Sequence, residues 1–427
     1  MQGRYPGTPG IERAARYIEQ SFREAGVTNV RREEFEISQR GPGEVYLRSG
    51  NKKFLNPNDI IIFGSAHINN DVEKQLVFGG RGTADELSSI DVEGRVVLVF
   101  VSNLRSTYEV AHALHNRKAF ALIAANPDNP AQFQSMNRTF KDHITAKRLF
   151  LDSDTIRRVP FLDTMRSACT FVIKNELIPV LMNTSSKNLS RSIDSKTVKD
   201  IPVASIGLKS EFVTNTIRSA NIIAHLPGST DTTIIISAHY DHMGQSGNDI
   251  FRGADDNASG TASIIALAKR YSAMKLLKYS MTFIALTGEE VGLLGSRYHT
   301  TKKDFDPSKV IFNLNIDMVG SIDSKHRSGQ PYIYVVQHTD SLAMSDLLEQ
   351  AAKANDIILD HSENGTIGMF QRSDQYSFHR RGIPAVHFFS GLHDRYHKPT
   401  DTYDSLNYPL LVRRAELANS FLLLMQQ

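Results

Sequence analysis

The sequence has 427 residues and a single cysteine, Cys169. One cysteine cannot form an intrachain disulfide, and it excludes thiolate-rich zinc and iron–sulfur clusters, so we expect a buried and inert thiol. No apolar run approaches the roughly 18 residues of a membrane-spanning helix; the strongest, Val96–Val101, has the length of a strand. Glycine and proline number 27 and 15, too few for a collagen-like or low-complexity chain. The composition is that of an ordinary globular protein with about two or three domains.

A strong charge imbalance is also absent, because the formal net charge is only +3. This mild value predicts no nucleic-acid partner. The largest local excess lies between Arg138 and Asp200, where 12 Lys and Arg accompany 7 Asp and Glu. We interpret this stretch as a solvated basic surface, and the alternative is a site for an acidic partner. The chain opens with the turn-like MQGRYPGTPG, without a basic and apolar leader.

Apolar periodicity predicts a helix near the start of the chain. Ile11, Ala14, Ile18 and Phe22 fall on one helical face, and Gly26 follows as a stop. From about 41 to 211 the pattern changes to short apolar runs separated by Gly, Asn, Asp and Pro, which predict strands and loops. One helix is expected there, near residues 108–116.

Predicted strands and helices alternate after about residue 212. The strands cover 232–238, 280–286, 310–316, 332–336 and 384–389, and the helices cover 258–273, 341–354 and segments beginning near 292 and 408. Such alternation predicts an α/β fold with a mostly parallel mixed sheet and helices on both faces. We therefore expect one domain formed by 1–40 and 212–427, interrupted by a β-rich domain over 41–211.

Histidine and acidic residues follow these predicted strands. They are His239, Asp241 and His242 after the first strand, Glu289 and Glu290 after the second, Asp317 after the third, and His393, Asp394 and His397 after the last. Asp255 and Asp256 precede the helix that begins near 258. Because ligands bind beyond the carboxyl ends of strands in open α/β sheets, we expect these side chains to converge on one edge.

This set of side chains indicates a metal site. Imidazoles and carboxylates are the ligands of borderline metals when thiolates are absent. Three carboxylates and a bridging hydroxide carry a charge that balances two divalent cations, whereas the carboxylates alone would repel one another. Two such ions polarise a carbonyl, and a remaining glutamate passes the water proton to the leaving amine. The pattern predicts metal-assisted amide hydrolysis.

Taken singly, each residue has a simpler interpretation. Asp256 and Asp317 fit helix caps or loops, the Glu289-Glu290 pair fits surface charge, and His397 fits an exposed loop. Five such elements at the strand ends of one α/β region favour the metal site.

Six stretches resemble a known family. They are GTPG, SAHYDHMG, GADDNASGTAS, TGEEVGLLGS, NIDMVG and YHKPTDTYD, in this order. They resemble the co-catalytic di-zinc aminopeptidase family that includes bacterial leucyl aminopeptidases, over the first 40 residues and nearly everything after 212. The resemblance implies a zinc exopeptidase-like fold and two Zn²⁺ per chain.

The resemblance also implies a role for each site residue. The implied metal ligands are His239, Asp256 as the bridging carboxylate, Glu290, Asp317 and His397. Glu289 resembles the general base, and Asp241 resembles the carboxylate that orients His239 through its other ring nitrogen. The residue pattern alone does not choose Glu289 over Glu290, or Asp256 over Asp255. Family members often carry a strained Asp-Asp peptide here, which would make Asp255 a structural support.

Outside these stretches the resemblance is weaker. The segment 41–211 resembles a protease-associated domain, chiefly in AFALIAAN and IPVASIGL; the alternative is a passive structural insertion. Phe370 stands near the position where some members have a tyrosine that stabilises the oxyanion, and phenylalanine donates no hydrogen bond. We expect His242 behind the ligands or at the surface, and His379, His387 and His393 in packing or loop roles.

The leading hypothesis is a zinc aminopeptidase that removes N-terminal residues from peptides with a free N-terminus, using a di-zinc-bound hydroxide and Glu289 as base. The alternatives are a carboxypeptidase, in which Arg372 and Arg380-Arg381 would hold a substrate carboxylate, a glutaminyl-cyclase-like acyltransferase with one zinc, and an inactive receptor-like binding module. Because members with such an insertion are commonly exported, we expect a secreted or periplasmic protein whose signal has been removed. The oligomeric state is left open.

Overall fold

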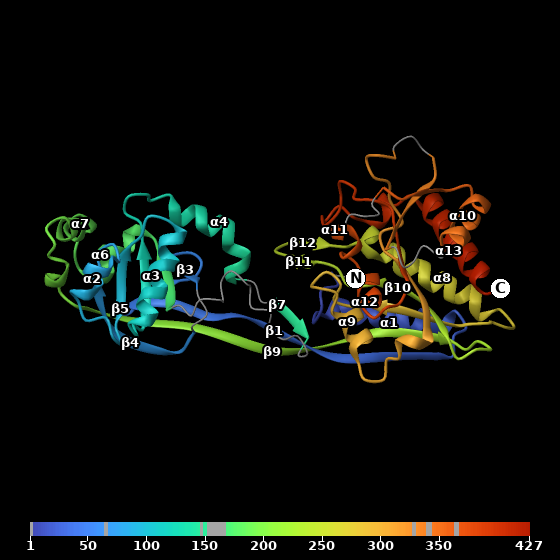
Figure 1. Cartoon of the computed structure of the whole chain (residues 1–427), viewed down its shortest axis with the longest axis horizontal. Helices are drawn as coiled ribbons and strands as arrows, with labels where there is room; N and C mark the ends of the chain where they lie inside the picture. The colour runs from blue at the N-terminus through green and yellow to red at the C-terminus, as the bar shows by residue number, and fades with distance from the viewer. Residues whose placement is uncertain are drawn as a thin grey trace. The chain divides into compact units, whose positions relative to one another are not determined.

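The computed structural model describes residues 3–63, 67–145, 148–151, 168–326, 330–338, 344–362 and 367–427. The chain divides into two compact units (Figure 1). Residues 1–37 and 216–427 make the first unit, and residues 38–215 make the second. Strands β1 (Asn29–Ser49) and β9 (Ala204–Leu226) contribute residues to both units. The second unit contains the whole of the predicted insertion, 41–211.

The first unit is built on a mixed sheet with the order β16-β15-β17-β14-β10-β13-β9. Besides β9, its strands are β10 (Thr233–His239), β13 (Ser280–Leu286), β14 (Val310–Ile316), β15 (Tyr332–Gln337), β16 (Ile358–Asp360) and β17 (Ala385–Phe389). β10 pairs in parallel with β13 and β14, and β17 pairs in parallel with β14. β15 is antiparallel to β17, and β9 is antiparallel to β13. The predicted mostly parallel mixed sheet is confirmed.

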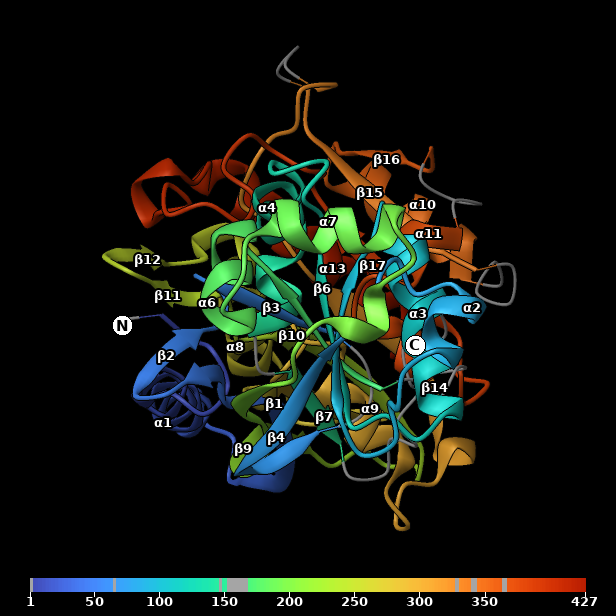
Figure 2. The same ribbon diagram turned by 90° about the vertical axis from the view of Figure 1, so that its left-hand side faces the viewer.

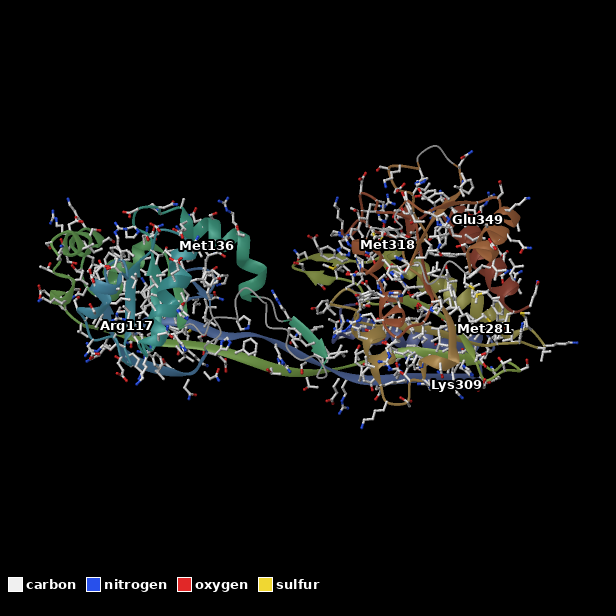
Figure 3. All side chains as sticks on the ribbon, viewed as in Figure 1. Arg117, Met136, Met281, Lys309, Met318 and Glu349 are labelled. Atoms are coloured by element: carbon white, nitrogen blue, oxygen red, sulfur yellow. The ribbon has the colours of Figure 1, made fainter. Side chains whose placement is uncertain are left out.

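Helices cover both faces of this sheet, as predicted. One hydrophobic core joins it to α1 (Pro9–Glu24), α8 (Gly260–Ser272), α10 (Ser345–Ala354) and α13 (Tyr408–Met425). Phe378 of α12 (Gln375–His379) packs on the opposite face. Side chains alternate along β10, so Ile234 and Ile236 lie in the first core and Ile235 lies with Phe378. Met281, labelled in Figure 3, is fully buried in the first core.

Local chemistry explains where two of these helices begin and end. Pro9 opens α1 at a position whose amide needs no intrahelical partner. Gly26, with a φ of +87°, adopts the left-handed conformation just beyond the helix. The side chain of Asn407 caps α13 by accepting a 3.1 Å hydrogen bond from the Leu410 amide.

The second unit has a mixed sheet with the order β9-β4-β5-β6-β8-β3. Its further strands are β3 (Ile60–Phe63), β4 (Ile68–Phe78), β5 (Val96–Phe100), β6 (Ala121–Ala125) and β8 (Cys169–Ile173). Val97 and Val99 of β5 share a core with α3 (Leu104–Asn116), whereas Leu98 shares the opposite core with α7 (Ser186–Asp194). This sheet also carries helices on both faces (Figure 2).

The second unit contains more helix than the sequence predicts. Besides α3, which covers the expected segment, it has α4 (Gln132–Thr145) and α7. These segments are mostly polar, and few of their apolar side chains, such as Phe133 and Met136, reach the core, so the sequence analysis did not recognise them as helices. Residues 146–147 and 152–167 of the basic stretch 138–200 lie outside the described residues, and its proposed surface stays a prediction.

The expectation of a buried thiol is met. Cys169 is buried, and burial raises the pKa of its thiol to about 12, so the group is inert at neutral pH. No described helix combines the length and the apolar character needed to cross a bilayer.

Candidate metal centre

Neighbouring parallel strands of the first unit deliver the central residues of the site. β10 ends at His239, Asp317 directly follows β14, and β13 leads into the loop that carries Glu289 and Glu290. Because β10 lies between β13 and β14, these strand ends meet at one edge of the sheet. The turn before α8 and the loop after β17 reach the same place.

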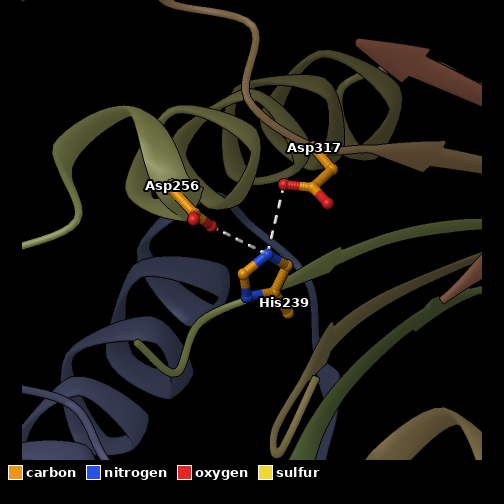
Figure 4. Close-up of side chains that lie close together, drawn as sticks. All are labelled: His239, Asp256 and Asp317. Atoms are coloured by element: carbon orange, nitrogen blue, oxygen red, sulfur yellow. Dashed lines mark hydrogen bonds and ion pairs between the residues drawn. The ribbon is translucent and has the colours of Figure 1, made fainter. Parts of the chain in front are cut away.

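A first group of donor atoms surrounds Nε2 of His239 (Figure 4). This atom lies 3.3 Å from Oδ1 of Asp256 and 3.1 Å from Oδ1 of Asp317. All three residues are buried. The other oxygen of Asp317 accepts a 2.7 Å hydrogen bond from the hydroxyl of Ser373. Asp317 is thus held from behind, with one oxygen directed at the group.

A second group forms around His397. Its Nε2 lies 3.2 Å from Oδ2 of Asp256 and 3.1 Å from Oε2 of Glu290. Asp256 therefore belongs to both groups, with one oxygen in each. Nδ1 of His242 lies 2.6 Å from Oε1, the other oxygen of Glu290.

The spacing of these donors fits bound cations. Two ligand atoms about 2.0–2.2 Å from one ion at a tetrahedral angle are roughly 3.3–3.6 Å apart. The contacts within the groups, 3.1 to 3.3 Å, are close to this spacing. Imidazole nitrogen and carboxylate oxygen are also donors that zinc accepts. The 2.6 Å contact between His242 and Glu290 is too short for two ligands of one ion and is a charge-assisted hydrogen bond.

Burial and opposite charges set the protonation of both groups. Burial lowers the pKa of His397, but its hydrogen bonds with Asp256 and Glu290 outweigh that effect and raise the pKa to about 10. Burial also opposes ionisation of Asp256, yet contacts with His239 and His397 lower the pKa of its carboxyl. A metal ligand must be a neutral imidazole, so cations and protons compete for both histidines.

Glu289 is an acidic residue that belongs to neither group. Burial raises the pKa of its carboxyl well above the usual value. His239 opposes this rise, and the charges of Asp317 and Glu290 add to it. Bound cations would favour the ionised form and counteract the rise. Glu289 therefore has the protonation chemistry of an acid–base group next to the donors.

Asp241 holds the loop that carries both glutamates. Its Oδ1 accepts a 3.1 Å hydrogen bond from the Glu289 amide, and its Oδ2 accepts a 3.3 Å bond from the Glu290 amide. The same Oδ1 lies 3.7 Å from Nδ1 of His239, longer than a hydrogen bond. Its contact with the backbone of the loop was not foreseen, and its implied role in orienting His239 stays a prediction.

The turn before α8 is held by residues that the sequence analysis did not single out. The Asp401 carboxylate accepts hydrogen bonds of 3.0 Å from the Asp255 amide and 3.1 Å from the Asp256 amide. Its only signal in the sequence is its place in YHKPTDTYD. The non-proline cis peptide joins Asp256 to Asn257, one position later than the Asp-Asp peptide implied by the resemblance.

Gly253 brings this turn close to His242. Its φ is +56°, and an added Cβ would lie 2.1 Å from the Asp256 carbonyl oxygen and 2.5 Å from Cγ of His242. Arg4, from the GRYPGTPG stretch, is buried beside it and donates to the carbonyls of Tyr240 at 2.6 Å and Gly253 at 2.9 Å. The Arg4 side chain thus links the segment after β10 to the turn before α8.

Two further histidines that the sequence analysis named, His393 and His387, are buried. His393 is buried, with its Nε2 3.1 Å from Oδ2 of Asp255 and its Nδ1 accepting the Arg395 amide at 3.1 Å. The contact between Nε2 and Oδ2 does not have the geometry of a hydrogen bond, and Asp255 is instead held by the Gly320 amide, which donates to its Oδ1 at 2.6 Å. His387 is buried as well, and burial lowers its pKa to about 4.

Phe370 is buried in a cluster with Tyr334 and Phe389. The arginines invoked for a carboxypeptidase, Arg372 and Arg380-Arg381, are exposed.

A buried polar network braces the glutamate loop at its base. Asn221 accepts the Thr287 amide at 3.2 Å and donates to the Gly295 carbonyl at 3.0 Å, so it joins both ends of the loop between β13 and α9 (Leu294–Thr301). Glu33 accepts from Asn221 at 2.8 Å and pairs with Lys302 at 2.7 Å. Burial opposes ionisation of Glu33, but hydrogen bonds from His299, Lys302 and Asn221 lower its pKa to about 2.

We expect Glu33→Gln to lower the free energy of unfolding by about 3 kcal/mol at pH 7, since it leaves the Lys302 ammonium and the buried side chains of His299 and Asn221 without their carboxylate partner. The folded pKa lies below the unfolded value of about 4.3, so the contribution is full above that pH and is lost as pH falls towards 2. Urea unfolding of both proteins from pH 7 to pH 2 measures it. Equal stability at pH 7 would contradict the assignment.

The sheet, its helices and the two donor groups define an α/β protein with a candidate divalent-metal centre. Residues 221–422 match the sequence model described as Peptidase family M28. This part of the chain is therefore similar to peptidase family M28. A probable leucine aminopeptidase of Trichophyton verrucosum (strain HKI 0517) is 28% identical over 227 residues, which are 51% of this chain and 60% of the relative. The chain thus spans about three fifths of that relative's length.

Two solved structures share the fold. The aminopeptidase from Aneurinibacillus sp. strain AM-1 is 23% identical, with a TM-score of 0.52 over 98% of this chain and 89% of that one. BSAP, a zinc aminopeptidase from Bacillus subtilis, is 20% identical, with a TM-score of 0.52 over 98% of this chain and 90% of that one. These similarities agree with the expected zinc exopeptidase-like fold.

Proposed function

We propose that the protein is a zinc-dependent aminopeptidase that binds two Zn²⁺ ions. The observation that carries this proposal is the position of Asp256, whose two oxygens face two separate groups of donors. His239 and Asp317 would hold one ion with it, and His397 and Glu290 would hold the other. A shared carboxylate of this kind lets two cations lie close together while it reduces their mutual repulsion.

The bound ions would supply Lewis acidity that polarises the peptide carbonyl and acidifies water. Glu289, which is outside both donor groups, accepts the proton of the attacking water and delivers it to the leaving amine. Asp241 keeps Glu289 in position by accepting the hydrogen bond of its backbone amide. The acidic surroundings favour a substrate ammonium, which supports a preference for peptides with a free N-terminus.

Two further properties are part of the proposal. The second unit is proposed to be a protease-associated domain, on the strength of the AFALIAAN and IPVASIGL stretches. Export to the periplasm or the exterior is proposed because relatives with such an insertion are commonly exported. N-terminal sequencing of the protein purified from its source tests export. We expect the mature protein to start after a removed signal.

Hydrolysis of leucyl anilide beside its N-acetylated analogue tests the activity. We expect cleavage of the free-amine substrate only, loss of cleavage after chelation, and recovery when zinc is returned. Bound metal is counted in the same samples by atomic emission. Two metals per chain without cleavage would contradict the leucyl specificity and direct the search to carboxy-terminal and glutamyl substrates. No metal and no cleavage would favour a receptor-like binding module.

A further inference from the structure

His242 contacts the second donor group, in which His397 is the proposed histidine ligand. It is fully buried, and its Nδ1 lies 2.6 Å from Oε1 of Glu290 and 3.8 Å from Oδ2 of Asp256. The 2.6 Å contact is that of a donated hydrogen bond from the ring to the carboxylate. Oε2 of the same carboxylate faces His397 at 3.1 Å. The two oxygens of Glu290 therefore have different partners.

The first donor group has the same arrangement. Oδ1 of Asp317 faces His239 at 3.1 Å, and Oδ2 accepts the Ser373 hydroxyl at 2.7 Å. In each group, the carboxylate that is not shared directs one oxygen at the other donors. Its second oxygen accepts a hydrogen bond from a side chain outside the group, which is His242 for Glu290 and Ser373 for Asp317. The centre is symmetrical in this respect, although the two holding residues come from different elements.

The backbone around His242 keeps its ring in place. Its amide donates to the Arg4 carbonyl at 3.2 Å, and Gly253 leaves the space in which the ring lies. Its Nε2 is buried and has no hydrogen-bond partner among the described residues, so the contact to Glu290 is the polar contact that orients the ring.

We infer that His242 is a positioning residue that restricts Glu290 to one-oxygen coordination and thereby sets the affinity of the second cation. The inference rests on the proposed function, because it needs cations at both groups. Hydrogen bonds to the outer oxygen of a ligating carboxylate orient it and are typically worth about 10–100-fold in metal affinity. The Ser373 hydroxyl has the corresponding effect on the first cation through Asp317.

Zinc titration of the metal-free full-length protein by calorimetry tests this inference without using activity. We expect His242→Ala to weaken one of the two sites by about 10–100-fold and to leave the other within about twofold. His242→Asn should restore much of the affinity, because its amide N–H can occupy the place of Nδ1–H. His225→Ala, which removes a half-buried histidine bonded to Thr282, is the control and should change neither site.

Two backgrounds identify the affected site. In Asp317→Asn, which disables the first group, His242→Ala should weaken the remaining site; in Glu290→Gln, which disables the second, it should have no effect. Ser373→Ala should weaken the remaining site in the Glu290→Gln background and have no effect in the Asp317→Asn background. Unfolding midpoints of the metal-free proteins confirm that each variant folds. If wild type takes up two zinc ions and His242→Ala binds both with unchanged affinity, the inference is wrong. If wild type takes up fewer than two, the two-ion proposal itself fails.

Discussion

Glu289→Gln lowers kcat by about 10²–10⁴-fold while the protein keeps its bound cations. The amide has nearly the size of the carboxyl group, so packing is preserved, but it cannot accept the proton of the attacking water. Glu289 is outside both donor groups, and its backbone amide is held by Asp241 independently of the side chain. The variant should therefore bind substrate with little change and lose the chemical step. Steady-state kinetics on leucyl anilide with parallel metal analysis measures both.

Glu290→Gln is the matched comparison, since it changes the adjacent residue in the same way. Its carboxylate faces His397, and we expect loss of a cation together with loss of activity. The two neighbouring variants thus separate proton transfer from metal binding. A Glu289→Gln enzyme with wild-type kcat would refute the assignment of the base, and one that has lost metal would show that Glu289 is a ligand.

Asp256→Asn should weaken cation binding at both groups and lower activity by about 10³-fold or more. The amide retains one oxygen, so it can serve only one group, and the negative charge that both cations share is removed. Polarisation by the cations is worth several kcal/mol of barrier, and each 1.36 kcal/mol corresponds to a tenfold change in rate. Metal content after dialysis against a fixed zinc concentration, together with kcat, measures the two effects.

Single-group variants are the controls for this second experiment. Asp317→Asn and Glu290→Gln should each weaken one site, whereas Asp256→Asn should weaken two. The reason is geometric, because Oδ1 of Asp256 faces His239 and Oδ2 faces His397. If Asp256→Asn loses only one cation with the other unaffected, Asp256 does not bridge the two groups.

Much of the first unit could be predicted from local sequence. Its central strands are buried on both faces, so they occur as largely apolar runs that are followed by titratable residues, as at His239 and Asp317. The expected strand over 280–286 has the bounds of β13. Short elements such as β16 and α12 were missed, because three to five residues carry too little periodicity to be recognised.

Local sequence is enough to predict which chemical groups gather at this edge of the sheet. Strand direction and the residue after each strand are local properties, and they suffice to bring imidazoles and carboxylates together. The tertiary structure decided which atom of each group faces which partner. Asp256 and Glu290 each divide their two oxygens between different neighbours, and that division depends on side-chain rotation and on segments far apart in the chain.

The supports behind the site were likewise decided only by folding. Glu33 and His299 are 266 positions apart, and Asp401 and Asp255 are 146 positions apart. No local pattern marks such residues, since an isolated acid in a sequence is usually a surface charge. They become recognisable only when burial removes water and leaves protein groups as the partners of each carboxylate.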